Sequence, residues 1–237
     1  MSTIAKNIAK VGARIREAAQ ASNRDPSAIG LLAVSKTQPA AALREAFAAG
    51  QRHFGENYLQ EALDKQRLLQ DLPLTWHFIG PIQSNKTRAI AEHFDWVHSV
   101  DRLRIAQRLS EQRPADLAPL NVCLQVNISD EDSKSGCAPQ DLAALASAVA
   151  ALPHIRLRGL MAIPQPSDDP HQQRTAFAAL RSLQQQLPLE LDTLSMGMSA
   201  DLEAAVAEGS TWLRIGTAIF GARDYGDAAT GQETPSQ

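Results

Sequence analysis

The sequence contains few of the residues that would place it in a specialised class. Two cysteines among 237 residues cannot make a disulfide framework, and aromatic residues amount to only 5%. The net charge of −3 provides no bulk attraction to a polyanion. No apolar run has the length of a membrane span, and the N-terminal segment lacks the apolar stretch of a signal peptide. We therefore expect a cytoplasmic protein without a membrane partner, a nucleic-acid partner or a metal site.

Short apolar runs alternate with longer amphipathic ones along the whole chain. The short runs have strand character and cover 30–35, 52–55, 75–80, 96–100, 121–128, 155–163, 192–196 and 212–216. The amphipathic runs have helical spacing and cover 1–20, 39–50, 139–153, 174–188 and 199–209. Taken alone, the run at 52–55 is a weak strand signal.

Eight strands alternating with helices favour a single α/β domain with the (β/α)8 TIM-barrel fold and an extra N-terminal helix. The alternative is an open doubly wound sheet. The first expected strand is followed by no GxGxxG turn, which counts against that alternative. We expect the barrel to span 1–223 and 224–237 to form a polar tail.

The segment "LLAVSKTQP" ends an expected strand with Lys36. In a TIM barrel the chemistry lies at the carboxyl ends of the strands, so Lys36 would lie on the functional rim. A lysine there can simply cover the rim with its stem while its amine reaches water. It can also be a desolvated nucleophile that forms a Schiff base. Lys36 by itself does not distinguish the two.

Polar and small residues follow the last two expected strands. TIM barrels often bind phosphate with the loops at that position, where this chain has Ser199, Gly216 and Thr217. Ser199 can cap the next helix, and all three residues could serve ordinary capping and turns. Together with Lys36 and with Arg214 at the same mouth, they indicate pyridoxal 5′-phosphate as the cofactor.

Several longer blocks occur in a characteristic order over nearly the whole chain. They are "AVSKTQP", "HFGENYLQEA", "WHFIGPIQSNK", "SKSG", "GLMAI", "LSMGMSADLEAA" and "RIGTAIFGAR". With these blocks the chain resembles the pyridoxal phosphate homeostasis proteins. The resemblance implies a barrel like the N-terminal domain of alanine racemase.

The resemblance also implies a role for individual residues. Lys36 would form the Schiff base, and the phosphate would be held by Ser199, Gly216 and Thr217. Arg214 would face the pyridine nitrogen, Asn57 would line the pocket near the ring and Met161 would pack against the ring. Lys134 matches a lysine thought to affect cofactor release, while Tyr58, His77, Asn85 and Lys86 lie in the matching blocks without an assigned contact.

The expected function is that of a carrier rather than an enzyme. Alanine racemases have a β-rich domain after the barrel that provides a second catalytic group, and only sixteen residues follow Gly221 here. An arginine at the ring nitrogen also weakens the ring as an electron sink. We therefore expect a monomer that holds pyridoxal phosphate reversibly, donates it to apo-enzymes and affects vitamin B6 and amino-acid balance. The alternatives are a small racemase or decarboxylase dependent on pyridoxal phosphate, and a barrel that uses Lys36 without a cofactor.

Overall fold

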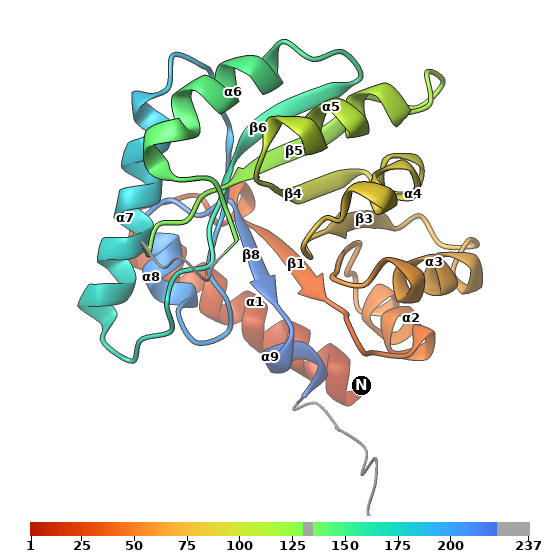
Figure 1. The fold of residues 1–237 in the computed structure, drawn as a ribbon. Coiled ribbons are helices and arrows are strands. Elements are labelled where there is room, and N and C mark those ends of the chain that lie inside the picture. Colours follow the sequence, from red (N-terminus) through yellow and green to blue (C-terminus); the bar gives the residue numbers. More distant parts are fainter. Residues whose placement is uncertain (130–134, 222–237) are drawn as a thin grey trace, which may run out of the picture.

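A closed barrel of parallel strands forms the centre of the computed structural model, which describes residues 1–129 and 135–221. Within these residues eight strands follow one another around the barrel in chain order, and β8 pairs with β1 (Figure 1). The expected TIM-barrel fold is therefore confirmed, and the open sheet is excluded. The strands are β1 (Gly30–Val34), β2 (His53–Glu56), β3 (Thr75–Phe78), β4 (Trp96–Val100), β5 (Leu120–Gln125), β6 (Ile155–Met161), β7 (Thr193–Ser195) and β8 (Trp212–Ile215).

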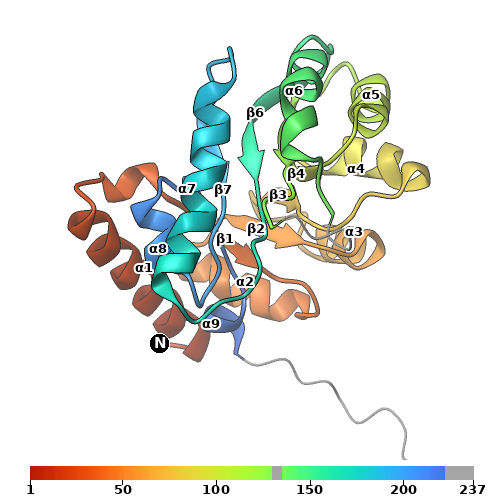
Figure 2. The same cartoon turned by 60° about the vertical axis from the view of Figure 1, so that its left-hand side comes forward.

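Helices surround the barrel, as Figures 1 and 2 show. They are α1 (Thr3–Ala21), α2 (Ala40–Ala48), α3 (Leu59–Leu68), α4 (Thr87–His93), α5 (Leu103–Gln112), α6 (Leu142–Ala150), α7 (Pro170–Gln186), α8 (Leu202–Ala207) and α9 (Thr217–Phe220). The extra N-terminal helix, α1, begins after the N-cap Ser2 and contacts α2, α8 and α9. None of the helices in the described residues is long and apolar enough to cross a membrane.

The aliphatic core lies between the strands and the helices, whereas rings fill part of the barrel interior. The rings of His77 and Trp96 stack with centroids 5.5 Å apart, and the Trp212 ring lies 5.1 Å from His77 and 6.0 Å from Trp96. TIM-barrel interiors usually hold branched aliphatic side chains. Here the rings bring polar nitrogens into the barrel, and buried nitrogens need hydrogen-bond partners.

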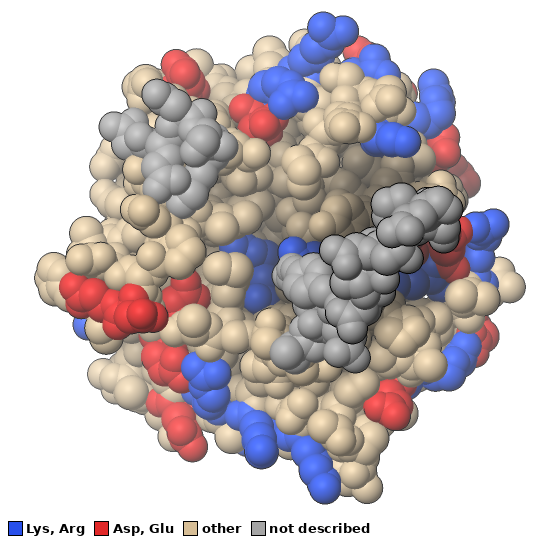
Figure 3. All heavy atoms as spheres, turned by 60° about the horizontal axis from the view of Figure 1, so that its bottom comes forward, with Lys and Arg blue, Asp and Glu red and all other residues tan. Residues whose placement is uncertain are grey.

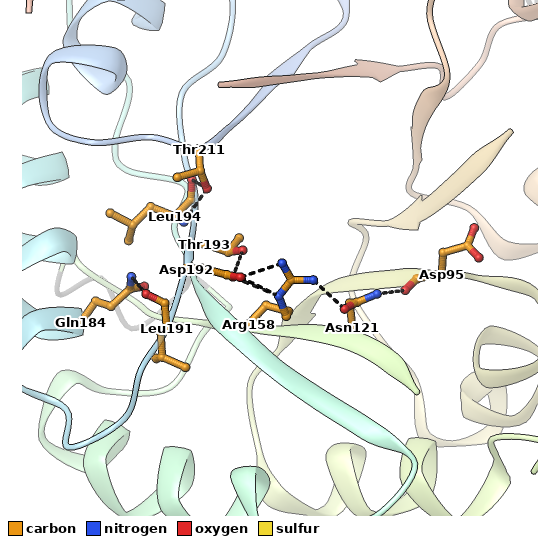
Figure 4. A network of polar contacts seen from close by, with 9 residues as sticks. All are labelled: Asp95, Asn121, Arg158, Gln184, Leu191, Asp192, Thr193, Leu194 and Thr211. Atoms are coloured by element: carbon orange, nitrogen blue, oxygen red, sulfur yellow. Dashed lines mark hydrogen bonds and ion pairs between the residues drawn. The ribbon is translucent and has the colours of Figure 1, made fainter. Parts of the chain in front are cut away.

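A polar network lies toward the amino end of the barrel, away from the carboxyl ends of the strands. Arg158 forms an ion pair with Asp192 at 2.7 Å and donates to Asn121 Oδ1 at 2.9 Å (Figure 4). Its guanidinium also lies 4.7 Å from the centroid of the Trp96 ring. These contacts join β5, β6 and the start of β7, and we assign them to stability because function in TIM barrels lies at the other end.

Some boundaries differ from those expected from the sequence. The weak run at 52–55 does form a strand, β2, while β5 ends at Gln125, earlier than expected. Sequence analysis did not identify α3, α4, α5 or α9, which occupy segments between expected strands. Helix α8 begins at Leu202, three residues later than expected. The expected tail, 224–237, lies outside the described residues.

Candidate functional site

A cavity of about 280 Å³ lies at the carboxyl ends of the barrel strands. Six of the seven predicted site residues line it, namely Lys36, Asn57, Ser199, Arg214, Gly216 and Thr217. The carboxyl ends of β1 and β8 point toward the bottom of Figure 1, and Figure 3 shows that face with basic side chains inside a central hollow. The closed barrel thus gathers predicted site residues that are up to 181 positions apart in sequence, from Lys36 to Thr217.

Lys36 lies two residues after the end of β1, and hydrogen bonds hold the residues on both sides of it. Ser35 Oγ donates to Glu56 Oε1 at 2.6 Å, and Ser35 O accepts from Lys65 Nζ at 2.7 Å. On the other side, Thr37 has a φ of 66°, in the left-handed region that a β-branched residue rarely adopts. Its N–H donates to Glu61 Oε1 at 2.6 Å, which stabilises this backbone. The backbone at Lys36 is therefore fixed from two sides.

These contacts belong to an ionic cluster formed by the buried Glu56 and Lys65 and the partly exposed Glu61. Lys65 Nζ lies 2.8 Å from Glu56 Oε1 and 2.5 Å from Glu61 Oε1. The Glu56 side chain is fully buried, and burial raises the pKa of Glu56 while the charge of Lys65 lowers it. Because a buried carboxylate needs compensation, Lys65 both neutralises Glu56 and supports the strand end that holds Lys36.

Arg214 in β8 directs its guanidinium into the same end of the barrel. Its Nη1 donates to Ser195 O at 2.6 Å and to Ser195 Oγ at 2.9 Å, and its Nη2 donates to Ala162 O at 2.9 Å. Burial lowers the pKa of Arg214 to about 10, so it remains a cation at neutral pH. An anchored cationic donor at this position suits an acceptor on a ligand.

The loops after β7 and β8 bring Ser199, Gly216 and Thr217 to the cavity. Ser199 does not cap α8 as expected, because Asp201 is the N-cap residue. Ser199 Oγ instead accepts from the N–H of Ala218 at 3.4 Å, which joins the two loops. Two hydroxyls and a glycine backbone thus lie at one edge of the cavity.

The carboxylates near these loops are directed to other partners. Asp201 Oδ1 accepts from the N–H of Met198 at 2.6 Å, inside its own loop. Glu203 forms an ion pair with Arg14 of α1 at 2.8 Å. Neither carboxylate lines the cavity, so neither would be in contact with an anion bound there.

Asn57 lies at the cavity wall with its side-chain oxygen, Oδ1, buried and without a hydrogen-bond partner among the described residues. Gly80 makes this position possible, since a Cβ there would lie 2.2 Å from the carbonyl oxygen of Asn57. Met161 does not line the cavity. It is fully buried in the barrel interior, where it packs with Trp96 and Cys123.

The residues of the matching blocks to which no contact was assigned lie outside the cavity lining. Tyr58 is 56% exposed, Asn85 and Lys86 are exposed, and His77 is buried in the barrel interior. Lys134 lies outside the described residues. In the part of the chain that the structure describes, no group of three or more His, Cys, Asp or Glu side chains could hold a metal ion.

Sequence analysis missed several residues of the site. Gln38, Met198 and Phe220 line the cavity, and each lies within three residues of a predicted site residue. Proximity to a strand end could have identified them. The ionic partners Glu61 and Lys65 lie on α3, and only their i, i+4 spacing is visible in the sequence.

Comparisons with known proteins show which family of barrels this fold and cavity belong to. The model of the family described as alanine racemase, N-terminal domain, matches residues 6–224, so the chain belongs to this family of barrels. Within it, the chain belongs to the pyridoxal phosphate homeostasis proteins, as shown by a relative of that name from Pseudomonas aeruginosa. The two sequences are 75% identical over 97% of this chain and 100% of the relative.

Two further relatives agree with this assignment. A pyridoxal phosphate homeostasis protein from Escherichia coli K12 is 59% identical over 95% of this chain and 99% of its own length. The solved structure of PipY from Synechococcus elongatus, described with pyridoxal phosphate bound, has a TM-score of 0.80 and 45% identity. It covers 92% of this chain and 100% of the PipY chain.

Proposed function

We propose that this protein binds pyridoxal 5′-phosphate reversibly as a Schiff base on Lys36 and acts as a carrier in the homeostasis of this cofactor, vitamin B6 and amino acids. The observation that carries the proposal is that Lys36, Arg214 and Thr217 line one cavity. The names of the curated relatives and the cofactor bound by PipY support it.

The residues present suit this cofactor. A volume of about 280 Å³ matches a single substituted ring with a phosphate, and Val34, Ile79 and Ile163 provide apolar walls. Asn57 Oδ1, buried and without a partner among the described residues, would be satisfied by a ligand donor. The cavity therefore offers an amine, apolar walls, hydroxyls and a cation in one place.

Each residue would have a distinct role. The Lys36 amine would condense with the aldehyde carbon, with the carbonyl oxygen leaving as water, and hydrolysis or exchange with another amine would release the cofactor. Ser199, Gly216 and Thr217 would hold the phosphate. Arg214 would face the ring nitrogen and Asn57 would lie beside the ring. Met161, which we expected against the ring, would instead support the cavity from the barrel interior.

The same geometry favours a carrier over an enzyme. When bound, the cofactor supplies a ring that can accept the electrons of a carbanion, most strongly when its nitrogen is protonated. Arg214 remains a cation at neutral pH and would leave that nitrogen unprotonated. Among the described residues, Lys36 and Arg214 are the titratable side chains that line the cavity, so Lys36 alone could move a proton. A small racemase or decarboxylase remains the alternative to be tested.

We further propose that the barrel of 1–223 acts as a cytoplasmic monomer that hands the cofactor to apo-enzymes. The support is that the cavity opens on the face of the barrel shown in Figure 3, where an amine of another protein could reach it. The identity of those enzymes would follow from transfer assays.

Borohydride reduction tests the Schiff base directly. The protein loaded with pyridoxal phosphate should lose its visible absorption band on reduction and retain a phosphopyridoxyl group on Lys36. Trypsin should then fail to cut after Lys36, which yields a modified peptide covering 25–44. Lys36→Met should abolish labelling, whereas Lys86→Met, at an exposed lysine outside the cavity, should not. Labelling at another lysine in the wild-type protein would overturn the proposal.

A further inference from the structure

Three histidines inside the barrel form a continuous chain of hydrogen bonds that ends at Arg214. His53 Nδ1 lies 3.1 Å from His77 Nε2, and His77 Nδ1 lies 2.9 Å from His98 Nε2. His98 Nδ1 lies 2.7 Å from Ser195 Oγ, which also accepts from Arg214 Nη1 at 2.9 Å. The chain thus runs from the first residue of β2 to the guanidinium in the cavity.

The strand register of the barrel explains why these residues meet. Gly55 pairs with His77, so His53 lies two residues before the partner of His77. Trp96 likewise pairs with His77, so His98 lies two residues after that partner. A step of two residues keeps a side chain on the same face of a strand. The three histidine side chains therefore all point into the barrel, and each one along the hydrogen-bond chain lies closer to the cavity than the one before it.

The three histidines of this hydrogen-bond chain are neutral at neutral pH. Burial lowers the pKa of His77 well below its ordinary value, and burial together with the charge of Arg214 lowers the pKa of His98 to about 3. Burial also lowers the pKa of His53, although the charge of Asp95 opposes this. Each neutral ring has one N–H and one acceptor nitrogen, so the chain must have a direction.

Arg214 determines that direction, because a guanidinium has donors and no acceptor. Ser195 Oγ therefore accepts from Arg214, and because Ser195 is fully buried its own hydrogen needs an acceptor within the protein. Among the described residues its side-chain hydrogen bonds join it to Arg214 and His98, so the hydrogen goes to His98 Nδ1. His98 then carries its proton on Nε2 and donates to His77 Nδ1. By the same reasoning, His77 carries its proton on Nε2 and donates to His53 Nδ1.

We propose that Ser195, His98 and His77 are positioning residues for Arg214, and that they hold its guanidinium through a one-way hydrogen-bond chain in which every histidine has the Nε2–H tautomer. The acceptor nitrogen of His98 fixes the Ser195 hydroxyl so that its lone pair faces Arg214. The guanidinium then keeps the orientation that directs it into the cavity. The role of Arg214 toward a ring nitrogen rests on the proposed function, whereas the direction of the chain does not.

Nitrogen-15 NMR of the protein without cofactor tests the chain itself. The long-range ¹H–¹⁵N spectrum should show the Nε2–H tautomer for His53, His77 and His98, each assigned by its His→Gln variant. His93, His154 and His171 are exposed and provide an internal reference for rings that exchange between tautomers in water. An Nδ1–H tautomer at His98, or averaged tautomers at His77 and His98, would overturn the proposal without affecting the proposed cofactor site.

Binding of two ligands tests the positioning role. Pyridoxal phosphate and its 1-deaza analogue, which has carbon in place of the ring nitrogen, differ only at the atom that Arg214 would face. Ser195→Ala should reduce the preference for pyridoxal phosphate over the analogue by about fivefold, as expected for one hydrogen bond of about 1 kcal/mol. A general loosening of the site would weaken both ligands equally and would contradict the positioning role.

A second serine provides a matched control. Ser210 is also fully buried, and its hydroxyl donates to Met196 O at 2.7 Å without contacting Arg214. Ser210→Ala should therefore leave the ligand preference unchanged, and an equal change in both variants would refute the specific role of Ser195. If the wild-type protein shows no preference between the ligands, the proposed Arg214 contact is wrong, while the tautomers still decide whether the chain exists.

Discussion

Replacing Lys65 with methionine should destabilise the protein far more than replacing an exposed lysine does. The change keeps most of the side-chain length but removes the ammonium that lies 2.8 Å from the fully buried Glu56 carboxylate. Removing one partner of a buried ion pair costs about 3–5 kcal/mol. Ser35 O and Glu61 lose the same donor, so we expect Lys65→Met to lower the free energy of unfolding by about 3–5 kcal/mol at pH 7.5.

The double variant Glu56→Gln/Lys65→Met shows whether an unpaired charge is the cause. It removes both charges, and neutralising a buried pair usually costs little, so we expect a loss of about 1–2 kcal/mol. Lys86→Met, at an exposed lysine, should change the unfolding free energy by less than about 0.5 kcal/mol. Urea denaturation followed by fluorescence measures all three. Equal losses in the single and double variants would refute the reasoning.

The pH dependence of Lys65→Met gives an independent check. Burial raises the pKa of Glu56 in the folded protein, and loss of Lys65 removes the charge that lowers it. The folded chain then binds a proton that the unfolded chain does not, so unfolding free energy falls as pH rises. Below the unfolded pKa of about 4.3 the deficit should fall to that of the double variant, about 1–2 kcal/mol, and it should grow as pH rises through the folded pKa. A deficit that does not change between pH 5 and pH 8 would contradict a buried charge as its origin.

Three further outcomes are expected. Thr217→Ala should weaken pyridoxal phosphate binding about tenfold or more but change the binding of unphosphorylated pyridoxal little. The control Thr175→Ala, at an exposed threonine, should change the binding of neither ligand. An equal loss for both ligands in Thr217→Ala would place the effect outside the phosphate site. The loaded protein should not exchange the Cα–H of L-alanine with deuterated water at about 1 per second or faster, a rate that would favour the enzyme alternative. Asp192→Asn should cost less than about 1 kcal/mol, because the carboxylate is half exposed. Since Arg158 lowers the pKa of Asp192, this contribution should be present above the unfolded pKa of about 3.9 and lost as pH falls, and acid denaturation of both proteins measures it.

Sequence patterns could predict the barrel and most of the cavity because both depend on local signals. Apolar runs alternating with amphipathic ones determine the order of strands and helices, and a parallel barrel brings all its carboxyl strand ends to one face. Lys36 and Thr217 therefore had to lie on the same face once both were assigned to strand ends. The weak β2 strand was predicted mainly because the rhythm required a strand there.

The ionic cluster could not be predicted in the same way. Glu61 and Lys65 have the spacing of an ordinary exposed pair on a helix, and most such pairs are solvated. Their burial depends on α3 packing against the end of β1, which is a tertiary contact. Met161 is a related case, because whether a residue at a strand end faces the cavity or the interior depends on local register as well as on its position.

The histidine chain shows what the barrel adds to the sequence. His53, His77 and His98 have no common spacing and no shared motif, and each separately is an ordinary polar residue in a strand. The two-residue step between paired strands brings their rings into line, and the barrel interior removes water, so each ring is neutral and needs its neighbour. A single permanent donor, Arg214, then determines where every proton in the chain lies. Hydrogen bonds that begin near the amino end of the barrel can in this way fix the orientation of a side chain in the cavity at its carboxyl end.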